Sequence, residues 1–133
     1  MYKLMEFRNQ EIRHRLEKVG RTASMLHVDV LLLIYHFAKV ASGNILEIGP
    51  YIGGSTIAAA IGARESDTPK KIISVEAGGR LKHRRIPSRN IFKDLKKNLA
   101  RFGVLEDIQW KKAAIPLFFL SLLFSRIFGR SGG

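Results

Sequence analysis

The sequence contains no cysteine among its 133 residues. This absence excludes disulfide bridges, thiolate metal sites and cysteine nucleophiles, and it is compatible with a reducing cytosol, so we expect a cytoplasmic protein. Acidic residues are also few, with 11 Asp and Glu against 23 Lys and Arg, which gives a formal net charge of +12. Such an excess favours nucleic acid, an anionic surface or acidic ligands as contacts, and a merely soluble basic surface is an equally good interpretation.

Long hydrophobic runs are scarce as well. No stretch reaches the roughly 18 apolar residues that a membrane span needs, and charged residues such as Glu6 and Arg8 leave no apolar signal core at the N-terminus. The most apolar segment is 115–133, which carries Arg126 within it. We expect this segment to form a helix that covers one face of a sheet, with a surface-membrane anchor as the alternative.

The stretch from Ile45 to Thr56 organises the rest of the chain. Its first four residues predict a short strand covered on both faces. Gly49 ends that strand, and the pair Gly53–Gly54 leaves bare backbone where a ligand can approach. Ser55 or Thr56 is expected to cap the helix that follows. Strand, turn and helix in this order predict a nucleotide or nucleoside site at the carboxyl end of a parallel strand.

Segments on either side of this stretch alternate in a pattern that predicts an α/β fold with a parallel sheet. Before it, the spacing predicts a helix that Gly20 ends and a second helix that is apolar nearly all round. After it, two further strands follow, each preceded by a helix. The predicted ranges are helices 2–19, 25–41, 55–64 and 88–102, and strands 45–48, 71–76 and 108 to 113 or 114.

Two carboxylates, Glu47 and Glu76, stand at the ends of adjacent predicted strands. A carboxylate after the second strand can accept hydrogen bonds from both hydroxyls of a ribose. Tyr51 takes the position of the second glycine in a dinucleotide fingerprint, where a side chain would crowd a pyrophosphate. No Gly-Lys-Ser or Gly-Lys-Thr follows the glycines, which excludes a P-loop. The pattern therefore favours a ligand with a ribose and no phosphates.

The run ILEIGPYIGGST followed by IISVE resembles motif I and the acid after the second strand in class I S-adenosylmethionine-dependent methyltransferases. Glu47, Gly49 and Gly53 match that motif, and Tyr51 replaces its middle glycine, as in the small-molecule O-methyltransferase-like branch. The resemblance covers about residues 25–113. It implies the N-terminal half of a three-layer Rossmann-like fold and transfer of a methyl group from S-adenosylmethionine to an unidentified acceptor. The residues that it places around the cofactor are Glu47, Gly49, Tyr51, Gly53, Gly54 and Ser55 at the methionine end and Glu76 at the ribose.

The resemblance also implies a domain organisation. We expect a helical extension over residues 1–24, a partial cofactor-binding domain over 25–114 and an apolar tail over 115–133. The family has about seven strands, so a chain with three is expected to be a truncated or diverged methyltransferase with impaired transfer. Its open sheet face would need cover from the tail or from a partner subunit.

Two other functions stay open. The basic run Arg80–Arg89, with the lysine-bearing face of 93–101, supplies the charge for a non-catalytic module that binds nucleic acid or a protein partner; a solvated loop is the plainer interpretation of that run. An NAD-type oxidoreductase is the other alternative. His27 and His36 lie on a predicted helix without neighbouring metal-ligand spacing, which favours ordinary helix-face histidines over catalysis or metal binding.

Overall fold

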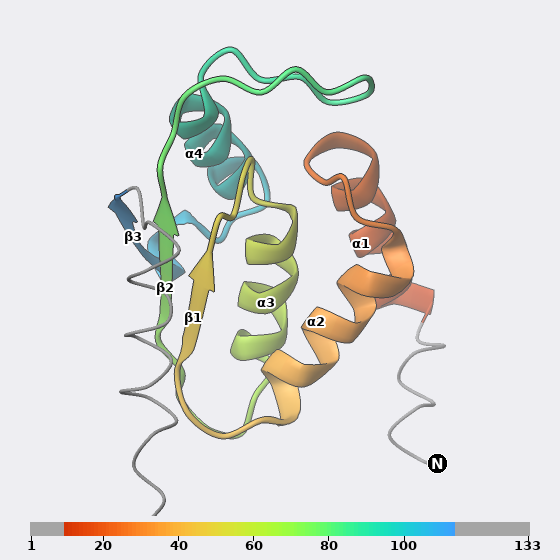
Figure 1. Ribbon diagram of the computed structural model, residues 1–133. Helices are drawn as coiled ribbons and strands as arrows, with labels where there is room; N and C mark the ends of the chain where they lie inside the picture. Colours follow the sequence, from red (N-terminus) through yellow and green to blue (C-terminus); the bar gives the residue numbers. More distant parts are fainter. Residues whose placement is uncertain (1–9, 114–133) are drawn as a thin grey trace, which may run out of the picture.

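The computed structural model describes residues 10–113 and places them around one three-stranded sheet (Figure 1). The strands are β1 (Ile45–Ile48), β2 (Ile72–Glu76) and β3 (Ile108–Lys112). They lie in the order β1-β2-β3 and every pair is parallel. The expected α/β fold, with the connectivity of the first half of a Rossmann-like sheet, is confirmed.

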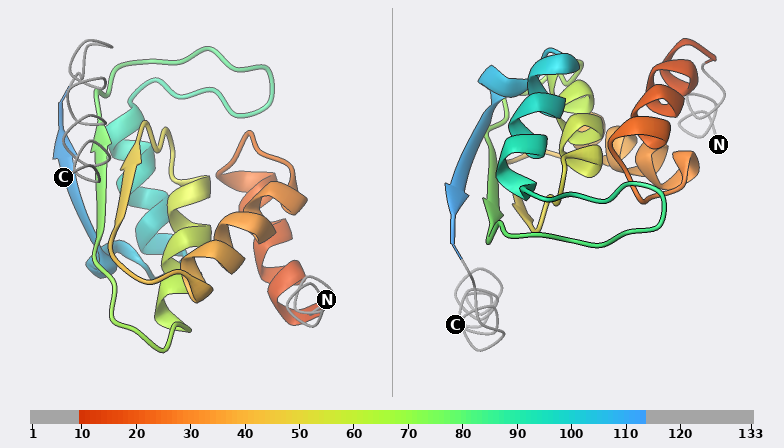
Figure 2. Two further views of the ribbon diagram at one scale, coloured as in Figure 1. Left: turned by 60° about the horizontal axis from the view of Figure 1, so that its bottom comes forward. Right: turned by 90° about the horizontal axis from the view of Figure 1, so that it is seen from above.

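Both crossover helices lie on the same face of the sheet, as right-handed crossovers require (Figure 2). They are α3 (Gly54–Arg64) and α4 (Ile91–Arg101), and a short 3₁₀ turn, η2 (Leu105–Asp107), leads into β3. α4 forms because apolar residues recur at helical spacing and Asn90 caps it by accepting the N–H of Lys93.

An outer layer of two helices, α1 (Gln10–Thr22) and α2 (Val28–Val40), packs against α3 (Figure 2). Ile12, Leu16 and Val19 of α1 are buried in the same hydrophobic core as the residues of the sheet and of α3. The N-terminal helix and the sheet therefore share one core over the described residues.

The two N-terminal helices depart from their predicted form. Gly20 does not end α1, which continues to Thr22, because the helix packs against α2 and a glycine within a packed helix costs only about 1 kcal/mol. α2 begins at Val28, later than predicted, because His27 takes the N-cap position and accepts the N–H of Asp29. α2 is also not buried all round. Its exposed apolar side chains are Val30, Leu33, Phe37 and Val40.

The first strand is less enclosed than its sequence predicts. Leu46 and Ile48 are 46% and 40% exposed, whereas Glu47 between them points toward α3, where it meets helix hydroxyls. Within residues 10–113, β1 has one neighbouring strand and helices on one face only, so a strand covered on both faces is wrong for this part of the chain.

The predicted apolar tail and the first residues of the predicted N-terminal helix lie outside the described residues. Within residues 10–113, no helix combines the length and the apolar character needed to cross a bilayer.

Candidate functional site

The loop after β1 and the tip of β2 are joined directly by hydrogen bonds. The backbone N–H of Tyr51 donates to Oε2 of Glu76 at 2.9 Å, and the N–H of Gly49 donates to the carbonyl of Val75 at 2.9 Å. The other carboxylate oxygen of Glu76 accepts the N–H of Gly78 at 3.0 Å. Two of the predicted site segments, 25 residues or more apart in sequence, are thus in contact at the carboxyl edge of the sheet.

A hollow of about 140 Å³ opens beside this junction. Four predicted site residues line it, together with the connection between α1 and α2, where no sequence motif indicates a function. Ligand sites for drug-sized molecules usually measure roughly 300 Å³ or more, so the hollow has room for an amino-acid-sized group and not for a whole nucleoside. The lining residues are Gly49, Pro50, Tyr51, Gly54 and Ser55 on one side and Ala23, Ser24, Met25 and Leu26 on the other.

Glu47 is joined to Ser55, one of the residues that line the hollow, and gathers hydroxyl groups. Its carboxylate accepts hydrogen bonds from Ser55 and Thr56 at the start of α3 and from Ser74 of β2, the last at 2.9 Å. Thr56 and Ser74 are fully buried. Glu47 therefore fixes the start of α3 to the sheet, and this position accounts for an acid within the strand.

The predicted helix cap is wrong. α3 begins at Gly54 with Gly53 as its N-cap, in a left-handed conformation and without a side-chain cap. Ser55 and Thr56 cannot serve as caps because they already lie inside the helix and their hydroxyls point to Glu47. The N-terminal N–H groups of α3 are therefore not covered by a side chain of the turn.

The glycines of the turn differ in what surrounds them. A Cβ at Gly49, which has a φ of 73°, would meet no heavy atom within 4 Å, so this backbone is open. A Cβ at Gly53 would press on Leu95 of α4, and one at Gly54 would overlap Ser24. Gly53 and Gly54, where bare backbone was predicted, thus allow close packing of the protein with itself, and the open backbone lies at Gly49 instead.

Tyr51 has an unusual conformation for a residue with a side chain. Its φ is 55°, in the left-handed region that non-glycine residues seldom adopt. Its hydroxyl donates to the carbonyl of Ile86 at 2.7 Å. Burial, and secondly the carboxylate of Asp94, raise the pKa of the Tyr51 phenol above its usual range. The side chain is therefore held as a neutral donor that ties the loop after β1 to residues 80–89.

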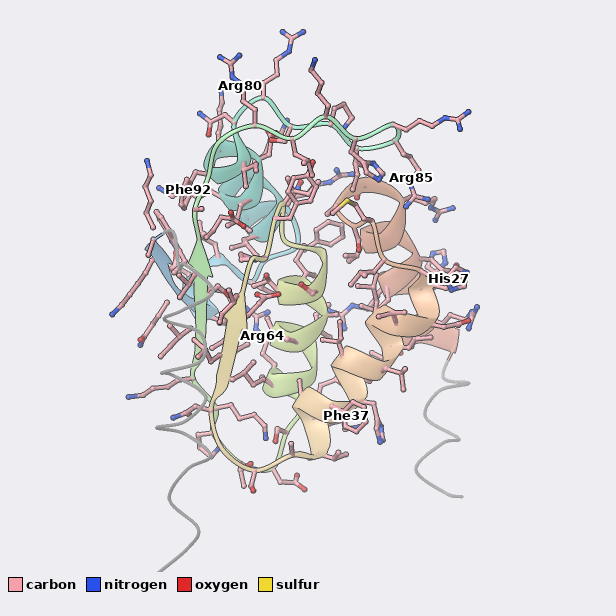
Figure 3. The ribbon with its side chains drawn as sticks, in the orientation of Figure 1. His27, Phe37, Arg64, Arg80, Arg85 and Phe92 are labelled. Carbon is pink, nitrogen blue, oxygen red and sulfur yellow. The ribbon has the colours of Figure 1, made fainter. Side chains whose placement is uncertain are left out.

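We call residues 80–89 the strap, because they cross the carboxyl edge of the sheet from β2 and α4 to the connection between α1 and α2 (Figures 1 and 2). Leu81 and Ser88 pair as an antiparallel bridge. At the far end, Nη2 of Arg85 donates to the carbonyl of Ser24 at 3.2 Å. Figure 3 shows Arg80 and Arg85 near opposite ends of the strap. The sequence predicted a basic run here and gave no indication that it folds over the site.

One further side chain, which no sequence motif includes, supports the turn. Asn98 of α4 is buried and donates from Nδ2 to the carbonyl of Ile52 at 2.9 Å. An asparagine on the apolar face of a predicted amphipathic helix is the sequence signal that could have indicated it, because a buried amide needs a hydrogen-bond partner.

No protein-family model matches the sequence, and no curated protein matches it. Among solved structures, the chain is similar to the cofactor-bound protein Rv0187 from MTB, at 16% identity and a TM-score of 0.49, over 92% of this chain and 47% of that one. It is also similar to TomG from Streptomyces achromogenes, an O-methyltransferase of tomaymycin synthesis solved in complex with SAM, at 17% identity and a TM-score of 0.49, over 93% of this chain and 49% of TomG. The chain spans about half the length of these proteins.

Proposed function

We propose that the carboxyl edge of β1 and β2 binds S-adenosylmethionine, and that methyl transfer to an acceptor is the activity which this binding serves. The observation that carries the proposal is the direct bond between the loop after β1 and Glu76, next to the open backbone of Gly49. The resemblance of residues 45–56 and 72–76 to class I methyltransferases requires these two segments to be adjacent, and this hydrogen bond joins them.

The residues present fit the cofactor. Each carboxylate oxygen of Glu76 accepts one backbone N–H, and a carboxylate has about four acceptor positions, so acceptor capacity remains for the hydroxyls of a ribose. Gly49, Tyr51, Gly54 and Ser55 would surround the methionine end in the hollow. Glu47 and Gly53 would support the hollow without lining it, because Glu47 holds Ser55 and Gly53 packs on α4. Bound S-adenosylmethionine would supply a methyl group on a sulfonium.

Tyr51 favours this ligand over a dinucleotide. A dinucleotide fold needs a glycine where its backbone approaches the pyrophosphate. Here Tyr51 fills that position, and its hydroxyl is engaged by Ile86. An NAD-type oxidoreductase is therefore disfavoured by the geometry as well as by the motif.

Isothermal titration of the full chain with S-adenosylmethionine, S-adenosylhomocysteine and NADH tests the proposal. We expect binding of the first two and none of NADH. Glu76→Gln should weaken binding by roughly tenfold or more, because a hydrogen bond to a charged acceptor contributes about 1.5–3 kcal/mol.

Glu106→Gln is the matched control, because Glu106 is an exposed residue of η2, which leads into the amino end of β3, whereas the hollow opens at the carboxyl end of β1. It should bind like the parent chain. Circular dichroism of each variant verifies its fold. Tight binding of NADH, or equal affinity of Glu76→Gln and the parent chain, would contradict the proposal.

A further inference from the structure

The strap carries positive charge without any internal compensation. Five of its ten residues are Lys or Arg and none is Asp or Glu. Besides Arg85, the strap carries four exposed cationic side chains that form no ion pair within residues 10–113. They are Arg80, Lys82, Arg84 and Arg89. Charge of one sign on an ordered loop attracts anionic ligands.

The bridge in the strap brings the backbones of two of these charged residues close together. Leu81 and Ser88 exchange both backbone hydrogen bonds at 2.9 Å, so Arg80 and Arg89 are the next opposing pair. Like charges directly opposite on paired strands are destabilising. The nearest acid along the chain, Asp94, accepts the hydroxyl of Ser88 at 2.6 Å and forms no ion pair with either arginine. An anion placed between Arg80 and Arg89 would turn this repulsion into attraction.

The strap is also ordered before any partner arrives. His83 accepts the N–H groups of Arg85 and Ile86 through Nδ1, at 3.2 and 3.1 Å, and so fixes the tip. Tyr51 and Ser24 hold that tip onto the rest of the protein. Because the backbone is fixed, a partner need not supply the free energy of ordering it.

We propose that the strap binds the phosphate backbone of nucleic acid without reading its sequence. A protein partner would normally need an apolar core of contact, and the strap offers only Leu81, which is 39% exposed, because Ile86 is buried. The same lack of apolar side chains disfavours insertion into a lipid surface. The strap contains no Phe, Tyr or Trp on which a base could stack, so its contacts are with phosphates, which position a chain and carry no sequence information.

Fluorescence anisotropy of the full chain with a labelled single-stranded RNA and with a DNA of the same sequence tests this proposal. We expect both to bind, with affinity that falls steeply between about 50 and 200 mM salt. Arg80→Gln/Arg89→Gln should weaken binding by roughly tenfold at the lower salt and reduce the salt slope by about 1.4, since each phosphate contact on a single strand contributes about 0.7 to it.

Lys18→Gln/Lys71→Gln is the matched control, because it removes the same charge from exposed positions on α1 and just before β2, outside the strap. It should leave affinity and slope nearly unchanged, and thermal melting verifies that both variants fold. Equal losses in the two double variants would overturn the proposal in favour of unspecific attraction by net charge. Binding to vesicles containing anionic phosphatidylserine that depends on the strap, without binding to either nucleic acid, would overturn it as well.

Discussion

Glu47 shows how one residue can match a functional motif and act as a structural link. Its carboxylate lies within β1 and collects hydroxyls from α3 and β2. Thr56 and Ser74 are buried donors, and a buried hydroxyl without an acceptor costs about 1–3 kcal/mol. Glu47 therefore shapes the candidate site through the helix that it anchors.

Tyr51 makes the attachment of the strap sensitive to alkaline pH. Burial and the carboxylate of Asp94 raise the pKa of its phenol, so the folded protein holds this proton more tightly than the unfolded chain does. The resulting stability is complete below pH 10.0, the ordinary value for tyrosine, and is lost as the pH rises through the higher folded pKa. We expect the free energy of unfolding, measured with urea, to fall above that pH.

Tyr51→Phe separates this contribution from the titration of lysines. The variant should be less stable by about 1 kcal/mol at neutral pH, because it lacks the hydrogen bond to Ile86. Above pH 10.0 its stability should fall less steeply than that of the parent chain. Parallel pH curves for the two proteins would show that the phenol of Tyr51 does not couple to folding.

At the scale of elements, the contact between α2 and α3 depends on a glycine. A Cβ at Gly62 would overlap the carbonyl oxygen of Tyr35 and approach the Cβ of Ala38. Since backbone atoms cannot move aside as a flexible side chain can, we expect Gly62→Ala to lower the free energy of unfolding by about 1–3 kcal/mol. Urea denaturation followed by circular dichroism measures this loss.

Gly20→Ala is a control with the same change in a different setting. Gly20 also lies within a helix, and a Cβ there would meet Leu31 Cδ1 at an ordinary 3.7 Å. Alanine should therefore raise the free energy of unfolding by about 0.5–1 kcal/mol through its helix propensity. If both variants lost stability equally, close approach of the helices would not be the reason for Gly62.

The elements themselves were largely predictable because local patterns decide them. Alternating apolar runs and Gly or Pro punctuation located all three strands and the helices between them to within about three residues. The cap of α3 was mispredicted because Ser55 and Thr56 find a better acceptor in Glu47, eight and nine residues earlier in the chain. A capping rule that considers only neighbouring positions in the sequence does not account for the competing acceptor Glu47.

The site as a whole was predictable only in part, for a related reason. Parallel strands bring their carboxyl ends to one edge, so the contact between Tyr51 and Glu76 follows from topology. The contacts from Tyr51 to Ile86 and from Arg85 to Ser24 join residues 35 and 61 positions apart across irregular loops. No periodicity records such contacts, which is why the strap and the connection between α1 and α2 were missed.

Over the whole molecule, the charge of +12 predicts an unusual response to salt. Mutual repulsion of like charges destabilises a compact state, and it is screened as the Debye length falls from about 30 Å at 10 mM to about 8 Å at 150 mM salt. We expect the melting temperature to rise over this range by about 4 °C, which corresponds to roughly 1 kcal/mol for a chain of this size. Chloride is the suitable anion, because phosphate or sulfate would act as a ligand of the strap.

The double variants locate this repulsion. Arg80→Gln/Arg89→Gln removes an opposed pair, so at low salt it should melt higher than the parent chain and respond less to added chloride. Lys18→Gln/Lys71→Gln lowers the net charge equally and should produce a smaller rise, because those two residues lie far apart in sequence, one on α1 and one before β2. A melting temperature that falls with salt would instead mean that attractive pairs such as Arg13–Asp29, at 3.2 Å, outweigh the repulsion, and the strap would then need no anionic partner to balance it.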